Sequence, residues 1–319
     1  MSSKPTVRLD FCDFYGIDKN DNFLTRILSR EYRIEINDRP DLVIYSKESH
    51  LHRLYTCKKL FWTGETIRPD FSTCDYAMTC YYIEDSRHLR FPYYVVGSGC
   101  RPEELLKAPG EAEAVASSGR KFCSFVISNA NPKRAGRRID FFRRLSRYKP
   151  VDSGGKGLNN IGSVISPGAR AKYDFIRGYK FNLCFENKSV EGYTTEKLVE
   201  AMWARCIPIY WGNPKVGLEF NTRSFLSLHD YRTEEEFLEA ILEVDRDDER
   251  YRRMLGEPYF PDNRVNEYYD ENRVLAFFER ILGDPTPPVS RRKRYLPLGR
   301  WRLAKRMYLH ADDAGGKGK

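Results

Sequence analysis

One stretch constrains the fold more than any other part of the chain: residues Tyr179–Pro214, with the sequence YKFNLCFENKSVEGYTTEKLVEAMWARCIPIYWGNP. It predicts a buried strand, a polar loop, an amphipathic helix and a second strand, Ile207–Trp211, buried on both faces. The helix carries apolar residues at roughly helical spacing, namely Leu198, Val199, Ala201, Met202, Ala204 and Cys206. A unit of this kind implies a parallel sheet with helices on its faces.

Polar residues gather in the loop and first helical turn of this unit: Glu186, Asn187, Glu191, Tyr193, Thr194, Thr195, Glu196 and Lys197. Ligands of doubly wound sheets bind at the carboxyl ends of strands and the amino ends of helices. We predict that Thr194 or Thr195 caps the helix, which puts Lys197 in a turn that the helix dipole already makes positive. A positive side chain is unfavourable there unless an anion binds between it and the helix end. The unit therefore predicts a site for a phosphorylated ligand. The alternative is an ordinary strand–helix–strand unit with a solvated loop.

The remaining sequence indicates two α/β halves. Strand and helix patterns alternate through residues 1–115 and again through 116–283, where the predicted helices include Arg137–Tyr148 and a final one, Asp270–Leu282. A stretch rich in Pro, Glu, Ala, Gly and Ser, about residues 101–119, reads as the linker. We therefore predict an α/β protein with two facing Rossmann-like domains and a cleft between them. One large α/β domain is the alternative.

Net charge and cysteine content indicate the kind of partner and the cellular compartment. The chain of 319 residues has a formal net charge of +9, which suggests an anionic partner. None of the eight cysteines forms a CxxC pair, so free thiols in a reducing compartment are expected. The first twenty residues are largely polar, unlike a signal peptide, and no apolar run approaches the roughly 18 residues of a membrane span. We expect a cytoplasmic protein.

Residues 284–319 form a separate basic tail beyond the last predicted helix. Its basic residues are Arg291, Arg292, Lys293, Arg294, Arg300, Arg302, Lys305 and Arg306, interleaved with aromatic and aliphatic residues such as Tyr295 and Trp301. This mixture suits an anionic membrane surface and predicts peripheral association with the inner face of the membrane. The alternatives are a merely soluble, disordered tail and, less favoured, a nucleic-acid-binding tail.

Several motifs resemble those of the α1,3/4-fucosyltransferases, glycosyltransferase family 10. The donor-binding motif of that family resembles YKFNLCFEN (Tyr179–Asn187), GYTTEKL (Gly192–Leu198) and IPIYWGNP (Ile207–Pro214). Four further landmarks occur in family order: FWTGE (Phe61–Glu65), SFVISNANP (Ser124–Pro132), RIDFF (Arg138–Phe142) and VDSGG (Val151–Gly155). The resemblance spans roughly Val43 to Leu282, and the chain looks like the bacterial, cytosolic branch.

The resemblance implies a GT-B fold and an inverting enzyme. Its donor would be GDP-β-L-fucose, and its acceptor a hydroxyl of N-acetylglucosamine or glucose in an oligosaccharide, such as a bacterial surface glycan. An α1,3 or α1,4 linkage is implied, although the residues themselves leave α1,2 open, as they do the acceptor and the oligomeric state. Two other interpretations compete: a GT-B transferase for another nucleotide sugar, and a non-catalytic basic module that binds nucleic acid or membrane.

The resemblance also assigns roles to residues. Glu65 of the FWTGE motif matches the general base. Lys197 matches a phosphate-binding lysine, Glu196 a glutamate near the ribose or fucose, and Asn187 and Tyr193 further donor contacts.

An arginine of the RIDFF segment completes the implied donor site. Arg138 matches the residue that contacts the diphosphate, but Arg134 and Arg137 leave its register open. No cofactor and no obligatory metal are expected. The sequence Asp245-Arg246-Asp247 spells the DxD pattern of metal-dependent transferases, yet it lies in a charged helical run that predicts a solvated surface.

Overall fold

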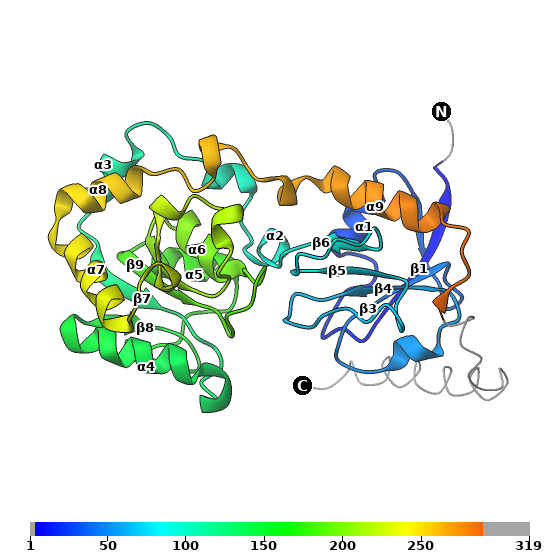
Figure 1. Cartoon of the computed structure of the whole chain (residues 1–319), viewed down its shortest axis with the longest axis horizontal. Helices are drawn as coiled ribbons and strands as arrows, with labels where there is room; N and C mark the ends of the chain where they lie inside the picture. The colour runs from blue at the N-terminus through cyan, green and yellow to red at the C-terminus, as the bar shows by residue number, and fades with distance from the viewer. Residues whose placement is uncertain (1–3, 290–319) are drawn as a thin grey trace.

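The computed structural model describes residues 4–289, without the side chains of Lys133 and Arg134. Within this range two parallel sheets form two lobes that lie side by side (Figure 1). The tail prediction falls almost wholly on residues 290–319, outside the described part. No helix among the described residues has both the length and the apolar character needed to cross a membrane.

The first lobe is built on a sheet of six strands in the order β2-β1-β3-β4-β5-β6, all parallel. The strands are β1 (Thr6–Cys12), β2 (Arg33–Ile36), β3 (Leu42–Tyr45), β4 (Lys58–Trp62), β5 (Tyr76–Thr79) and β6 (His88–Arg90). Helix α1 (Phe23–Leu28) covers this sheet, and Asn22 caps it by accepting from the backbone N–H groups of Leu24 and Thr25. Leu9 pairs with Leu42 in the register of the central strands, and both are fully buried.

The second lobe is built on a parallel sheet in the order β11-β10-β9-β7-β8. Its strands are β7 (Lys121–Phe125), β8 (Val151–Ser153), β9 (Tyr179–Phe185), β10 (Ile207–Trp211) and β11 (Leu226–Ser227). Its helices are α3 (Glu111–Ala116), α4 (Pro132–Tyr148), α5 (Ala169–Ile176), α6 (Glu196–Trp203), α7 (Glu234–Arg246) and α8 (Asp248–Gly256). Strand β9 is buried on both faces, because Leu183 packs with one core and Cys184 with the other.

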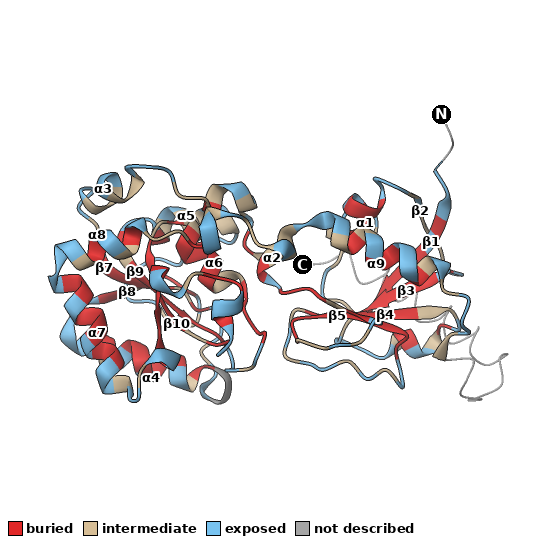
Figure 2. Cartoon of the chain, turned by 45° about the horizontal axis from the view of Figure 1, so that its top comes forward, coloured by how far each residue is buried: buried red, intermediate tan, exposed pale blue. Residues whose placement is uncertain are grey.

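The last helix, α9 (Glu271–Gly283), packs on the first lobe, although sequence order places it with residues 116–283 (Figures 1 and 2). Val274, Phe277, Phe278 and Ile281 of this helix join the core of the first sheet. The chain therefore crosses between the lobes twice, once near the short helix α2 (Tyr94–Gly97) and again before α9. An amphipathic pattern predicts a buried face, but not which sheet covers it.

Two further differences concern boundaries. Helix α4 begins at Pro132, five residues before the predicted start, and a proline is well tolerated there because the first helical N–H has no partner. The predicted linker contains α3.

All eight cysteines lie in the described range and are free, as expected.

Strand order locates the ligand crevices. In the first sheet the order reverses between β1 and β3, and in the second between β9 and β7. Ligands of open α/β sheets bind beyond the carboxyl ends of strands at such points. The loops after β1, β3, β4 and β9 contribute to one cavity between the lobes.

Candidate active site

A cavity of about 480 Å³ lies between the two lobes. The first lobe lines it with Phe14, Tyr15, Ile17, Ser46, Lys47, Glu48, Trp62, Thr63, Gly64, Glu65, Tyr93 and Val96, and the second with Asn187, Tyr193, Thr195, Glu196 and Lys197. Five of the six side chains singled out from sequence therefore share this cavity: Glu65, Asn187, Tyr193, Glu196 and Lys197. Arg138 does not line it.

Glu65 is an exposed carboxylate of the first-lobe wall, as is Glu48. It follows β4 in the loop Thr63-Gly64-Glu65, and its backbone N–H donates to Thr63 Oγ1 at 3.2 Å. Glu65 shares the cavity with the amino end of α6, which lines it from the second lobe. A carboxylate at this position can accept a proton from a ligand held between the lobes.

Lys197 is bound to a carboxylate that sequence reasoning did not single out as functional, Glu186. Glu186 directly follows β9, is fully buried, and accepts from the backbone N–H of Thr195 at 2.7 Å and from Lys197 Nζ at 3.0 Å. Thr195 occupies the cap position of α6, but its hydroxyl donates to Glu186 instead of capping the helix, contrary to the prediction. The sequence feature that could have marked Glu186 as functional is its position at the carboxyl end of a buried strand.

The two carboxylates keep Lys197 charged. Burial lowers the pKa of its ammonium, but the charges of Glu186 and Glu196 outweigh burial and hold the pKa above its usual value. Burial raises the pKa of Glu186 despite the nearby Lys197. For Glu196, whose Oε1 lies 3.4 Å from Lys197 Nζ, the attraction of Lys197 and Lys172 exceeds the effect of burial and lowers the pKa. The cavity thus has a permanently cationic group at the amino end of α6.

Asn187 and Tyr193 flank this group. Asn187 is exposed, whereas Tyr193 is buried and packs with Cys80 and Tyr81 of the first lobe. Burial, together with the charge of Glu186, raises the pKa of the Tyr193 phenol, which therefore stays protonated and can donate.

Arg138 belongs to α4 and has 6% of its surface exposed. Burial lowers the pKa of its guanidinium, and the charge of Glu186 opposes that effect. Arg137 instead pairs with Glu234, Nη2 to Oε1 at 2.6 Å, and lies over the ring of Trp211. The side chain of Arg134 is outside the described residues. Of the two described arginines, Arg138 is the one on the Glu186 side of α4.

Tyr93 is a cavity residue that sequence reasoning missed. Its side chain is 40% exposed, yet its ring lies against Gly64 and Gly97, where an added Cβ would come within 2.5 Å and 2.4 Å of ring atoms. Burial raises the pKa of its phenol, with a further contribution from Glu196. The ring therefore sits between the Glu65 loop and the α6 terminus. No spacing in the sequence marks this contact.

The DxD pattern has a structural role. Asp245 is buried, not solvated as predicted, and pairs with Lys149 at 2.5 Å and Lys180 at 3.2 Å. Asp247 caps α8 by accepting from the N–H groups of Glu249 and Arg250. Residues 4–289 contain no group of three or more His, Cys, Asp or Glu side chains arranged for a metal ion.

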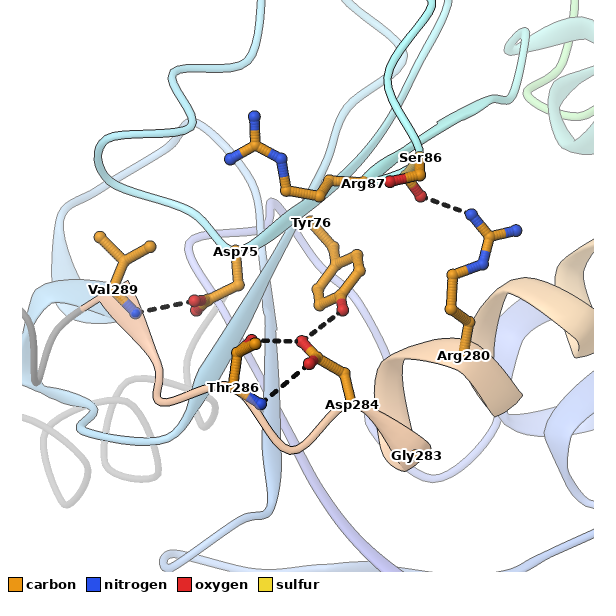
Figure 3. A pocket seen from close by; sticks show the side chains of 9 residues that line it. All are labelled: Asp75, Tyr76, Ser86, Arg87, Arg280, Gly283, Asp284, Thr286 and Val289. Atoms are coloured by element: carbon orange, nitrogen blue, oxygen red, sulfur yellow. Dashed lines mark hydrogen bonds between the residues drawn. The ribbon is translucent and has the colours of Figure 1, made fainter.

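A larger cavity, of about 640 Å³, lies on the first lobe where the chain leaves α9 (Figure 3). Its polar groups bind one another: Asp284 accepts from Tyr76 at 2.6 Å and from Thr286, and Arg280 donates to the carbonyl of Ser86. These contacts fasten the chain after α9 to the first lobe. The cavity between the lobes, where two domains contribute unlike chemistry, is the better candidate site.

Comparison with known proteins identifies the family of the chain. Two family models match: the N-terminal domain of alpha-(1,3)-fucosyltransferase FucT over residues 9–97, and the C-terminal domain of glycosyltransferase family 10 (fucosyltransferase) over residues 116–258. The chain belongs to glycosyltransferase family 10. It is a fucosyltransferase with the GT-B fold, so the resemblance and fold drawn from the motifs are confirmed.

Two relatives of this fucosyltransferase match it over most of both chains. The alpha-(1,3)-fucosyltransferase FucT of Helicobacter pylori is 31% identical over 90% of this chain and 68% of its own length. A crystal structure of an α1,3-fucosyltransferase with GDP-fucose has a TM-score of 0.72 and 29% identity, over 89% of this chain and 93% of that one. A shorter match, at 32% identity, covers 41% of this chain and 28% of the GDP-fucose protein O-fucosyltransferase 3 of Bos taurus.

Proposed function

We propose that this enzyme transfers L-fucose from GDP-β-L-fucose to a hydroxyl of N-acetylglucosamine or glucose in a glycan, with inversion and in an α1,3 linkage. One observation carries the proposal. A single cavity is lined both by the exposed carboxylate of Glu65 from the first lobe and by the ammonium of Lys197, at the amino end of α6, from the second. Two of the relatives named above, the Helicobacter pylori enzyme and the enzyme of the crystal structure, are α1,3-fucosyltransferases and support the linkage. The crystal structure, which contains GDP-fucose, also supports the donor.

Inversion requires in-line attack from the face opposite the leaving group. The acceptor oxygen forms a bond to C1 of fucose while the bond from C1 to the β-phosphate oxygen breaks, and GDP takes the electron pair. Glu65 receives the acceptor proton, a contribution of roughly 10²–10⁴ in rate. Its place on the first lobe, away from the phosphate-binding side, suits that role.

Cationic groups of the second lobe would stabilise the departing GDP. Lys197 and the first residues of α6 line the cavity, and Arg138 of α4 interacts electrostatically with Glu186, the partner of Lys197. Preorganised charge at a leaving group typically contributes about 10²–10³ per group. Because Glu186 and Glu196 keep Lys197 protonated, this charge is present before the donor arrives.

These cationic groups of the second lobe, Lys197 and Arg138, support a reaction that needs no divalent metal. Metal-dependent transferases use DxD carboxylates and a cation to neutralise the diphosphate, whereas Asp245 here is held by two lysines inside the second lobe. The wild-type enzyme should transfer fucose at the same rate with and without excess EDTA. A rate that falls with EDTA and returns with Mn²⁺ or Mg²⁺ would contradict the proposal.

Aromatic side chains of the first lobe suit a sugar acceptor. Phe14, Tyr15 and Trp62 line the same cavity as Glu65, and Tyr15 is 94% exposed. Aromatic faces supply apolar contact for the C–H face of a sugar ring, and a few polar groups then orient it. We propose that the acceptor is an oligosaccharide of a bacterial surface glycan.

The decisive experiment is an acceptor array with GDP-fucose, followed by linkage analysis of each product. We expect transfer to acceptors that contain N-acetylglucosamine or glucose, and α1,3-linked fucose in the product. A parallel panel of other nucleotide sugars serves as the control. Turnover with another donor, and none with GDP-fucose on any acceptor, would refute the proposal.

A further inference from the structure

A buried ion pair joins the two lobes beside the candidate site. Arg90, the last residue of β6 in the first lobe, pairs through Nη2 with Oε1 of Glu219 in the second lobe, and their exposed fractions are 8% and 1%. The hydroxyls of Tyr82 and Tyr94 donate to the same carboxylate at 2.6 Å and 2.8 Å. Three side chains that precede the crossing into the second lobe thus hold one second-lobe carboxylate.

The guanidinium of Arg90 also reaches the donor loop. Its Nη1 donates to the carbonyl of Gly192 at 3.2 Å. Gly192 has φ +85°, and an added Cβ would lie 2.2 Å from the carbonyl oxygen of Cys80. Only glycine fits this conformation and this close approach. Beside the packing of Tyr193 on Cys80 and Tyr81, the first lobe therefore contacts the backbone of the donor loop at Gly192, a position that cannot change.

Asn213 ties these contacts to the catalytic segment. Fully buried after β10, it accepts from the N–H of Gly192 at 2.8 Å and donates to Thr194 Oγ1 at 3.2 Å. Its side-chain nitrogen also lies 3.4 Å from Glu219 Oε1. Gly192 is bound on one side by Arg90 and on the other by Asn213, five residues before Lys197.

We propose that Arg90 is a positioning residue for the transfer reaction: through Glu219 and Gly192 it holds the donor segment 192–197 at a fixed distance from Glu65. This inference rests on the proposed function of the cavity. A buried ion pair is weak evidence for stability, because desolvation offsets the attraction, but it does select one geometry. In-line transfer depends steeply on geometry, and a displacement of about 1 Å costs about 10²-fold in rate.

Arg90→Lys is the first test. Lysine keeps a positive charge for Glu219 but lacks the planar fork that serves Glu219 and Gly192 together. We expect kcat for fucosyl transfer to fall roughly tenfold to 10²-fold. The dissociation constant for GDP should stay within about threefold, because Lys197 and Arg138 belong to the second lobe. The matched control is Arg87→Lys, an exposed first-lobe arginine paired with Asp85, which should leave kcat within about twofold.

A double-mutant cycle separates positioning from a merely structural role. If Arg90 acts by placing the donor opposite Glu65, then Arg90→Lys should cost much less in a Glu65→Gln background than in the wild type. Equal fold-losses in the two backgrounds would overturn the proposal. So would a loss of GDP affinity as large as the loss of kcat.

Tyr82→Phe keeps the test valid if Arg90→Lys does not fold. It removes one hydroxyl that donates to Glu219 and leaves the ion pair intact, so we expect a loss of roughly threefold to tenfold in kcat. An unchanged kcat in a folded variant of either residue would overturn the positioning role alone. A wild-type chain that transfers no fucose would overturn the proposed function as well.

Discussion

Lys197 shows how one charge depends on its neighbours. Its ammonium lies 3.0 Å from Glu186, a fully buried carboxylate, so removing the lysine leaves that carboxylate without its cation. We expect Lys197→Met to lower kcat about 10²–10³-fold and the free energy of unfolding by about 3–5 kcal/mol. Steady-state kinetics and urea unfolding measure the two effects. Lys188→Met, in the exposed part of the same loop, is the control.

A second substitution separates the two roles of Lys197. In Lys197→Met/Glu186→Gln no buried charge remains unpaired, so stability should recover while activity does not. Recovery of activity together with stability would mean that Lys197 serves the fold and not the phosphate.

Glu65 should behave differently, because its carboxylate is exposed and holds little of the fold. We expect Glu65→Gln to lower kcat by roughly 10²–10⁴ while leaving stability and the dissociation constant for GDP nearly unchanged, since an amide cannot accept the acceptor proton. Glu48→Gln is the matched control: it is another carboxylate of the cavity wall on the first lobe, paired with Lys47. Transfer by Glu65→Gln at the wild-type rate would exclude Glu65 as the base.

At the scale of elements, α6 carries a buried carboxylate that titrates near neutrality. Burial raises the pKa of Glu200 from 4.5 to about 7, although Lys172 lies 2.7 Å away and opposes the shift. A carboxyl whose pKa is raised on folding binds more protons when folded, so its stabilising effect is complete below pH 4.5 and is lost as the pH rises through 7.

The corresponding test compares Glu200→Gln with the wild type in urea at pH 4.5 and pH 7.5. Between these values the wild type should lose roughly 2–3 kcal/mol of unfolding free energy relative to the variant. Equal slopes with pH for the two proteins would show that Glu200 does not titrate in this range. Glu239→Gln, an exposed residue of α7, controls for the general effect of charge removal.

Individual elements differ in how far sequence predicts them. Strands β9 and β10 and helix α6 follow from apolar runs and helical spacing, and the motifs around them predict the residues of the second lobe that line the cavity. The position of α9 does not follow, because Phe277 and Phe278 mark a buried face without naming its partner. The contact of Tyr93 with Gly64 likewise joins residues of separate strands and loops, and only the folded first lobe brings them together.

The same limit applies to Glu186 and to the link through Arg90. Glu186 was visible as a polar residue at a strand end, but its role depends on Thr195 and Lys197 folding back onto it. Arg90 and Glu219 lie 129 residues apart and meet only when the two lobes pack. Family motifs therefore predicted five residues that line the cavity, whereas the groups that hold them in place required coordinates.

For the whole molecule, charge distribution gives a prediction about location. Eight Lys and Arg residues lie between Arg291 and Arg306, interleaved with Tyr295, Leu296, Trp301 and Tyr308. Deleting residues 290–319 should weaken binding to anionic lipid vesicles, because each basic residue near such a surface contributes about 1 kcal/mol. Turnover on a soluble acceptor should change little, since both walls of the candidate site lie within residues 14–197.

Cosedimentation with vesicles of phosphatidylserine and phosphatidylcholine measures the effect, with pure phosphatidylcholine as the control. The shortened chain should keep Val289 as its last residue, because the backbone N–H of Val289 donates to Asp75 at 2.7 Å and fastens this end of the described chain to the first lobe (Figure 3). Binding of the full chain should fall as salt is raised, since the attraction acts over a Debye length of about 10 Å at 0.1 M. Equal binding of the full and shortened chains to anionic vesicles would show that the tail does not bring this fucosyltransferase to a membrane.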